Sequence, residues 1–326
     1  SALLADTASL FGQENRILTL HWAPGSGIAD NALLPDRLKG HEQLSANYRY
    51  ELTCFSPDAG LELKHLQGQI LEIRILEADG SQRHINGIVT EAKQIGADGG
   101  FASYSLTLEP ALALLAQRIN SRAFQDLSVV EIVTAILDEH RSANPVIQAG
   151  FKLDTQLDKE YPQRSYCLQY RESDLDFISR LLREEGISFT YAFSQDEDSP
   201  MHTLVLFDDV YRLPQQKQTN IRFHRDDSSE EADGITQWLG ARQISASMTG
   251  LASYDYKPVT TQMARAMTRI GTGDDANQAQ RTLEWYDPQT AYYGASWEEA
   301  LRYAALRHDS RDLQAKTFMA ESNVRG

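Results

Sequence analysis

The sequence predicts a β-rich α+β fold in which two antiparallel β-barrel-like units flank an α/β domain. Residues 16–108 hold short strand-like runs separated by turn-forming residues, and residues 110–207 add helices with one apolar face. Strand patterns return after residue 208, around a single helix. Short antiparallel strands with turns between them are typical of barrels and sandwiches. We therefore divide the chain into a first barrel at 1–109, an α/β intermediate domain at 110–207 and a second barrel with a helical insertion at 208–326.

Composition and charge exclude several classes of partner. The 326-residue chain is 41% hydrophobic and 24% charged, as expected of a globular protein with two or three domains. Its formal net charge of −15 repels phosphate backbones and anionic membrane surfaces, and Lys and Arg are scattered singly. The longest apolar runs, such as 111–116, are far shorter than the ~20 residues that cross a bilayer. We expect no nucleic-acid partner and no membrane anchor.

The cysteines and the first residues indicate a chain made in the cytoplasm. Cys54 and Cys167 lie far apart within apparent strands, which favours reduced core thiols over a disulfide. Residues 1–6 have neither the basic start nor the apolar core of a signal peptide. We expect no Sec-type export.

The first unit is predicted from strand-like runs and the turns between them. Turn-forming residues around Pro57, Gly80 and Gly99 separate the runs and close hairpins. None of these glycine-containing groups has the spacing of a phosphate-binding loop, so turns are the better interpretation. The predicted strands are 17–22, 48–54, 70–75, 85–92 and 104–108.

The intermediate domain begins at Pro110, which suits the first turn of a short helix. Ser128 and Glu131 have the spacing of a capping box at the start of a longer helix. Asn144-Pro145 is predicted to end that helix. Its buried stripe is Val129, Ile132, Val133, Ile136 and Leu137.

The clearest pattern in the chain is strand, helix and strand over residues 166–191. Tyr166, Leu168 and Tyr170 alternate with Cys167 and Gln169, which predicts a strand with one buried face. A helix follows, with Ser173 and Asp176 at its start, and Gly186 supplies the left-handed residue that ends it. The helix should bury Leu175, Ile178, Leu181 and Leu182, and opposite charges one turn apart occur at Asp176, Arg180 and Glu184. Alternation at Ile187, Phe189 and Tyr191 predicts the second strand, and 203–207 a further one.

The third unit contains a predicted strand at 238–248, with Ile244, Ala246 and Met248 on one face and an exit at 254–258. Ser296 and Glu299 are predicted to cap a helix, and 315–320 returns to a strand. The face of that helix should be formed by Trp297, Leu301, Ala304 and Ala305.

Candidate chemical groups all have simpler structural explanations, so we predict no catalytic, cofactor-binding or metal-binding residue. His140 has no second His or Cys one turn away, which favours a solvated helix end over a metal ligand. The carboxylate pairs Asp174/Asp176 and Glu184/Glu185 lie at the two ends of one helix, and the first pair favours the positive end of its dipole.

Two further groups are weighed in the same way. The acidic run 226–233 lacks the ligand pattern of a calcium loop and is predicted to be a solvated loop. Neither an HExxH arrangement nor a Gly-x-Ser-x-Gly elbow occurs; 294–298 is only superficially similar to the latter. An aromatic cluster is predicted to pack in the core or at a subunit interface rather than form a carbohydrate platform, and comprises Trp285, Tyr286, Tyr292, Tyr293 and Trp297.

The stretch 164–191 resembles the VgrG family. The order Tyr170-Arg-Glu-Ser-Asp-Leu-Asp-Phe177, then Arg180-Leu-Leu, then Glu184-Glu-Gly-Ile187 is similar to the hallmark of that family. The resemblance is specific there and thin between 208 and 312, where insertions are expected. Further matching residues are Leu34-Pro35 through Gly40, Glu42, Ser45, Gln67-Gly68, Asn86-Gly87-Ile88-Val89 and Glu321 through Gly326.

Members of that family are the spike proteins of type VI secretion systems. The resemblance implies a homotrimeric hub, related to the hub of contractile phage tails, that caps a hexameric tube protein of the haemolysin-coregulated type. It implies baseplate components as partners, and a spike tip protein and effectors bound through a part beyond Gly326. Such a chain would be cytoplasmic during assembly and then injected through the contractile machine. We expect the third unit to be incomplete at Gly326, ending in an edge strand.

Two other functions stay open at this point. The hub of a phage tail would share the same pattern. A cell-wall-degrading tail enzyme is the alternative from a different class, and it would need two carboxylates converging in one cleft.

Overall fold

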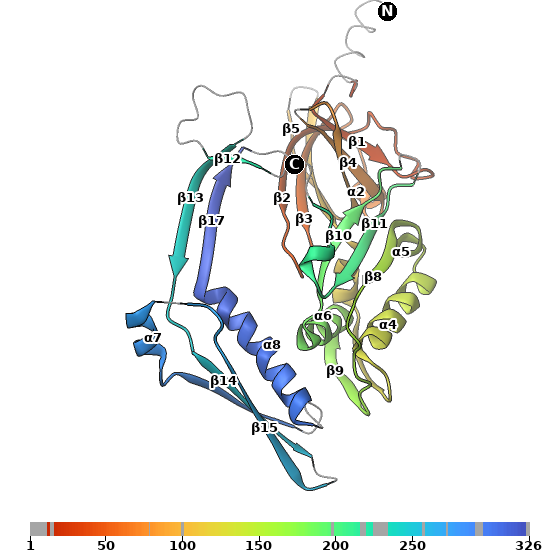
Figure 1. Cartoon of the computed structure of the whole chain (residues 1–326). Coiled ribbons are helices and arrows are strands. Elements are labelled where there is room, and N and C mark those ends of the chain that lie inside the picture. Colours follow the sequence, from red (N-terminus) through yellow and green to blue (C-terminus); the bar gives the residue numbers. More distant parts are fainter. Residues whose placement is uncertain are drawn as a thin grey trace, which may run out of the picture.

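The computed structural model describes residues 12–13, 16–77, 79–98, 101–196, 199–215, 220–223, 234–255, 258–271, 273–290 and 296–323. Figure 1 shows a half-barrel, a helix-containing domain beneath it and a third unit beside them. The third unit contains α8, a long helix that runs beside the intermediate domain.

The half-barrel is one antiparallel sheet with strand order β1-β4-β5-β6-β3-β2. Its edges are β1 and β2, which are not hydrogen-bonded to each other in this order. The predicted antiparallel strands of the first unit are confirmed, and β2 was missed because its sequence is polar after Pro35. The bounds are β1 Leu18–Trp22, β2 Leu34–His41, β3 Arg49–Ser56, β4 Ile70–Leu76, β5 Gln82–Asp98 and β6 Phe101–Glu109, with the short helix α2 at Leu63–Leu66.

The concave core of the half-barrel is formed by alternate residues of these strands. Leu20, Leu52, Ile73 and Leu106 are fully buried there, because period-two alternation directs them to the same side of the sheet. Cys54 is also buried in this core, and both cysteines are free thiols.

The intermediate domain packs helices against a mixed sheet of order β10-β11-β8 and a two-stranded ribbon of β7 and β9. The capping box at α4 is confirmed, since the Ser128 hydroxyl accepts from the Glu131 N–H and the Glu131 side chain accepts from the Ser128 N–H. Its predicted stripe is buried. The bounds are α3 Ala111–Leu114, η1 Leu115–Gln117, β7 Ile119–Phe124, α4 Val129–Ala143, α5 Pro145–Gly150, β8 Phe151–Gln156, β9 Cys167–Ser173, α6 Asp174–Glu185, β10 Ser188–Phe193, β11 His202–Phe207 and η2 Val210–Arg212.

The strand, helix and strand predicted at 166–191 are present as β9, α6 and β10. Ser173 caps α6, and Gly186 ends it with a φ of 71°. The one buried face predicted for β9 is formed by Cys167 and Gln169, and Leu168 on the other face is exposed. A polar Gln169 takes the inner side, since it bonds to a buried carboxylate of α6.

The third unit has a three-stranded sheet β12-β13-β17 and another of order β15-β14-β16. The single strand predicted at 238–248 was wrong: β13 ends at Arg242 and β14 begins at Met248, because the two strands pair in different sheets. The bounds are β12 Arg222–Phe223, β13 Gly234–Arg242, β14 Met248–Asp255, β15 Thr260–Met267, α7 Asp274–Gln280, β16 Glu284–Thr290, α8 Trp297–Ala315 and β17 Lys316–Ser322.

One pair of strands in the third unit differs from the expected antiparallel barrel. β14 pairs in parallel with β16, because β15 and α7 form a crossover between them. The small core of this unit lies between β14, β15 and α8, with Leu251, Ala264, Ala300 and Tyr303 buried. β17 lies at an edge of its sheet, next to β13.

Candidate assembly surfaces

Asn86 on β5 joins the half-barrel to the β10–β11 hairpin. Its side-chain Nδ2 donates to the carbonyl of Ser194 at 3.1 Å and to that of Met201 at 3.3 Å. The Tyr48 hydroxyl donates to the Asn86 carbonyl at 2.5 Å. A Cβ on the next residue, Gly87, would lie 3.0 Å from the Tyr48 hydroxyl, so glycine permits this close contact. The Asn-Gly pair noted in the sequence is thus a junction between two domains.

His202 on β11 forms a buried contact with the start of the intermediate domain. Its Nε2 accepts the backbone N–H of Ala111, at 2.8 Å, where α3 begins after Pro110. The ring is fully buried, and burial lowers the pKa of His202 to about 3. The imidazole is therefore neutral near pH 7 and caps the helix as an acceptor. No signal in the sequence indicates this role beyond a histidine at the start of an apolar run.

Glu185, the last residue of α6, connects the intermediate domain to α8. Its fully buried carboxylate accepts from Arg164 Nη2 at 2.6 Å and from the Tyr303 hydroxyl at 3.0 Å through Oε1. Oε2 accepts from Arg302 Nη2 at 2.8 Å. Burial, reinforced by the charge of Glu185, raises the pKa of Tyr303 to about 12, so its hydroxyl stays a donor. Of the Glu184/Glu185 pair, Glu185 is therefore the member that lies at the centre of a buried ion-pair network.

Gly186 brings α6 and α8 into close contact at the same junction. An added Cβ would lie 2.5 Å from Leu306 Cδ2 on α8. The residue also has φ of +71°, a left-handed conformation that side chains disfavour. Gly186 therefore ends α6 and also allows α8 to pack closely against that end.

Asp174 and His140 form a buried ion-pair cluster at the start of α6. The fully buried Asp174 lies 2.7 Å from His140 Nε2 and accepts from Gln169 Nε2 at 2.7 Å and from Arg122 Nη2 at 3.2 Å. The solvated helix end predicted for His140 was wrong, because its side chain is only 12% exposed. Asp176, by contrast, is exposed. The two carboxylates do not converge on a cleft, and their partners give them structural roles.

The ribbon of β7 and β9 presents an apolar outer face. Leu168 lies opposite Ala123 and Tyr170 opposite Ser121 in its register. Tyr170 is 61% exposed, and Ile119 at the start of β7 is 71% exposed. Tyrosine-rich exposed faces of this kind are common at protein interfaces.

The ribbon formed by β13 and β17, hereafter the β13–β17 ribbon, exposes apolar residues on both of its faces. Trp238 and Phe318 lie on one face with ring centroids 5.6 Å apart, and each is more than half exposed. Leu239 and Met319 are opposite one another on the other face, and Met319 is 67% exposed. Figure 1 shows the ribbon standing apart from the half-barrel. A ribbon of this kind has little stability of its own in water.

The three described members of the predicted aromatic cluster lie near the surface of the third unit rather than deep in its core. Trp285 is partly buried under Arg311, whose guanidinium carbon lies 4.0 Å from the ring centroid. Tyr286 and Trp297 are each about half exposed, with fractions of 51% and 53%. The other two aromatic residues of the cluster, at positions 292 and 293, lie outside the described residues. Core packing is therefore wrong for Tyr286 and Trp297, and interface packing stays a prediction.

Other candidate groups give no sign of a chemical site. Within the described ranges, no cluster of His, Cys, Asp and Glu could hold a metal ion. The helices in those ranges include none with the length and hydrophobicity needed to cross a membrane. The acidic run 226–233 lies outside the described residues, as do residues 1–6.

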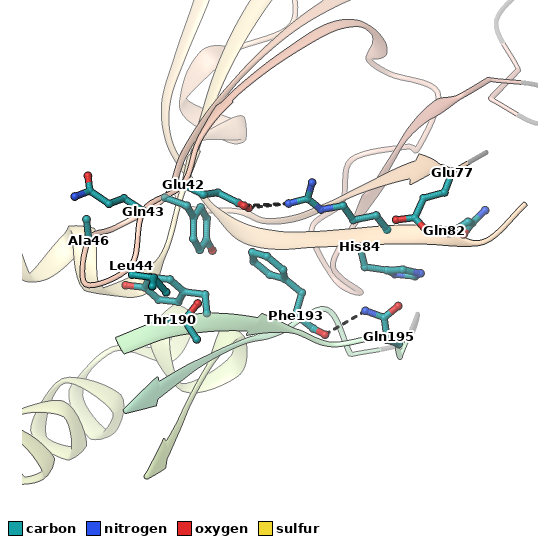
Figure 2. Close-up of a pocket in the computed structure, with 13 residues that line it drawn as sticks. Glu42, Gln43, Leu44, Ala46, Glu77, Gln82, His84, Thr190, Phe193 and Gln195 are labelled. Atoms are coloured by element: carbon teal, nitrogen blue, oxygen red, sulfur yellow. Dashed lines mark hydrogen bonds and ion pairs between the residues drawn. The ribbon is translucent and has the colours of Figure 1, made fainter. Parts of the chain in front are cut away.

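A cleft of about 750 Å³ separates the half-barrel from β10. Figure 2 shows Glu42 on its upper wall, His84 on β5 and Phe193 on β10 directed into the space between them. Arg83 Nη2 donates to both carboxylate oxygens of Glu42, at 3.0 and 3.1 Å. His84 Nδ1 lies 2.8 Å from Glu72, a fully buried carboxylate that also pairs with a neighbouring arginine. The cleft was not predicted, because its walls come from distant parts of the sequence.

Comparison with known proteins supports the predicted resemblance. The chain is 39% identical over 84% of its length to the type VI secretion system spike protein VgrG4b of Pseudomonas aeruginosa. It is 31% identical over 92% of its length to VgrG1b of the same organism. The chain spans 32% and 38% of the length of these relatives.

The fold agrees with that of a solved tail protein. A 43 kDa tail protein from prophage MuSo2 of Shewanella oneidensis matches 95% of this chain and 82% of its own, with a TM-score of 0.57 at 15% identity. The model of the phage tail baseplate hub (GPD) family matches residues 41–326. This chain therefore belongs to the phage tail baseplate hub family.

Proposed function

We propose that this chain is the hub part of a type VI secretion spike. The observation that carries the proposal is the match to the hub family over 41–326, together with relatives named as spike proteins of that secretion system. The described residues offer binding faces and buried structural ion pairs, which suits a structural part of an assembly. We propose a non-enzymatic role for the chain on these grounds.

The hub is a homotrimer in this proposal. The β13–β17 ribbon supports it, because both of its faces are apolar and exposed. Each face therefore needs a neighbouring subunit to cover it. A two-fold dimer would cover one face of each ribbon with the same face of its partner. A head-to-tail ring covers both faces, since each copy offers one face to the copy before it and the other to the copy after it. Three copies form the smallest such ring.

The trimer presents six barrel-like surfaces to a hexameric tube protein. Each chain contributes two strand-rich units, the half-barrel and the third unit, so three chains contribute six. The net charge of −15 favours a tube with complementary basic groups at its rim, so docking should weaken as salt rises. Baseplate components, a spike tip protein and effectors complete the proposed partners. The chain would assemble in the cytoplasm and leave with the tube.

Light scattering on the chain extended beyond Gly326 tests the assembly. We expect a trimer mass across a concentration series, and dissociation when Leu239→Asp places a charge on one face of the ribbon. Leu313→Asp is the matched control, because Leu313 is 76% exposed on α8 outside the ribbon. In cells, Leu239→Asp should abolish release of the tube protein and Leu313→Asp should not. A dimer, or a monomer at every concentration, would overturn the ring.

A phage tail hub is the second candidate, favoured by the family description and by the fold shared with a prophage tail protein. Deleting the gene distinguishes the two. Loss of tube-protein release with normal phage yield supports the secretion hub. Loss of infectious phage particles supports the tail hub.

A further inference from the structure

Strand β10 has an open edge. It is the outer strand of the sheet β10-β11-β8. Ser194 N–H donates to Met201 O at 2.8 Å, directly beyond the pair of Phe193 and His202, so that pair is a non-hydrogen-bonded one. By alternation, Phe189, Tyr191 and Phe193 direct their backbone N–H and C=O groups away from β11.

The two ends of this edge already have partners. Ser45, on the loop after β2, donates its N–H to the Phe189 carbonyl at 2.8 Å and accepts the Phe189 N–H on its hydroxyl at 3.3 Å. The side chain of Gln195 donates to the Phe193 carbonyl at 3.3 Å. Between them, no described group bonds the outward N–H and C=O of Tyr191. Ser45 thus occupies the position of an added strand, and the next position along the edge is open.

This open position lies in the cleft between β10 and the half-barrel (Figure 2). Phe193 supplies an aromatic surface there, and it is backed by the buried Tyr48, with ring centroids 5.3 Å apart. Leu44, at the rim, is 54% exposed. The single arginine in the lining, Arg83, is already paired with Glu42, so the cleft has no free cation for an anionic ligand. Its volume of about 750 Å³ is within the range of ligand sites.

We propose that this cleft binds a short extended segment of a partner polypeptide, which adds to the edge of β10. An edge strand offers donors and acceptors at every second residue, and only another extended main chain repeats that spacing. The segment continues the ladder that Ser45 begins, and the Tyr191 N–H and C=O form its central hydrogen bonds. An apolar side chain of the segment packs on Phe193. This binding does not depend on the proposed secretion role.

A library of random linear peptides displayed on ribosomes is the probe. We expect the chain to enrich peptides with an apolar residue at alternate positions. Thr190→Arg fills the cleft and should weaken binding of a selected synthetic peptide roughly tenfold or more. Ala192→Arg is the matched control, because Ala192 is on the same strand and outside the cleft lining. If Thr190→Arg unfolds the chain, Leu44→Glu at the rim replaces it.

N-methylation of the peptide distinguishes strand addition from other binding. Methyl groups at every second amide should abolish binding in one register and leave it unchanged in the other, because only alternate N–H groups of an added strand face β10. Three results would overturn the proposal. They are no enrichment of peptides, equal binding by the Thr190→Arg and Ala192→Arg variants, or equal tolerance of methylation in both registers.

Discussion

The Tyr303 hydroxyl of α8 donates a 3.0 Å hydrogen bond to the carboxylate of Glu185 at the end of α6. Arg164 and Arg302 reach the same buried carboxylate from two other directions. Groups from two domains therefore share one negative charge, and the free energy of their association depends on it.

Removing the Glu185 carboxylate should be strongly destabilising. Glu185→Ala removes the buried one of the two carboxylates that pair with Arg164, whose side chain is 7% exposed, and the other carboxylate, Glu184, remains. Loss of one member of a buried ion pair costs about 3–5 kcal/mol of unfolding free energy, which urea denaturation measures. Asp309→Ala, on an exposed position of α8, should change it by less than about 0.5 kcal/mol. Equal effects would show that the junction does not depend on this charge.

Gly186→Ala should destabilise the chain more than Gly68→Ala. Both glycines have positive φ, +71° and +78°, so each substitution carries a left-handed strain of about 1–2 kcal/mol. Of the two glycines, Gly186 alone has a neighbour that the new Cβ would meet, the end of the Leu306 side chain, and its displacement adds about 1 kcal/mol. Thermal unfolding of the two variants gives the comparison. Leu306→Ala combined with Gly186→Ala should recover the part of the loss due to the contact.

Leu181→Ala should cost about 2–5 kcal/mol of unfolding free energy, through lost burial and a cavity. Leu181 is completely buried in the core of the intermediate domain. Arg183, two residues further along α6, is exposed, and Arg183→Ala should have little effect. Chemical denaturation of both variants checks this, and similar losses would contradict the assignment of the buried face.

Acid should destabilise the fold through His202. Its pKa is lowered from 6.5 to about 3 by burial, so the unfolded chain binds a proton that the folded chain does not between these values. Stability then falls as pH falls below 6.5. Between pH 6.5 and 4.5 the loss due to His202 should be about 2 kcal/mol.

His202→Gln provides the comparison, because glutamine keeps an acceptor for the Ala111 N–H and does not titrate. Unfolding free energies of the two proteins at both pH values measure the difference. Parallel pH profiles would contradict a buried neutral imidazole.

Local signals in the sequence were sufficient for most helix ends. Ser128, Ser173 and Ser296 all cap the helices predicted for them, and Gly186 ends α6. Such signals act within one turn of chain, so one sequence is enough to find them.

Features that depend on distant residues were not predicted correctly. The buried state of Glu185 depends on Arg302, more than a hundred positions away in the chain. The direction in which β9 faces is set by α6, because Gln169 bonds to Asp174 and so takes the inner side. Alternation predicts that a strand has two unlike faces, and it does not say which of them is covered.

The helix α8 passes directly into β17, since it ends at Ala315 and the strand begins at Lys316. The Ala315 carbonyl accepts the N–H of Gln243, next to the end of β13, so both strands of the ribbon are held to the helix. With 19 residues, α8 is about 28 Å long, and its first half is anchored at Glu185. Because α8 is held at Glu185 near one end and joined to the ribbon at the other, a small change in the tilt of α8 at Glu185 would move the far end of the ribbon by a larger distance.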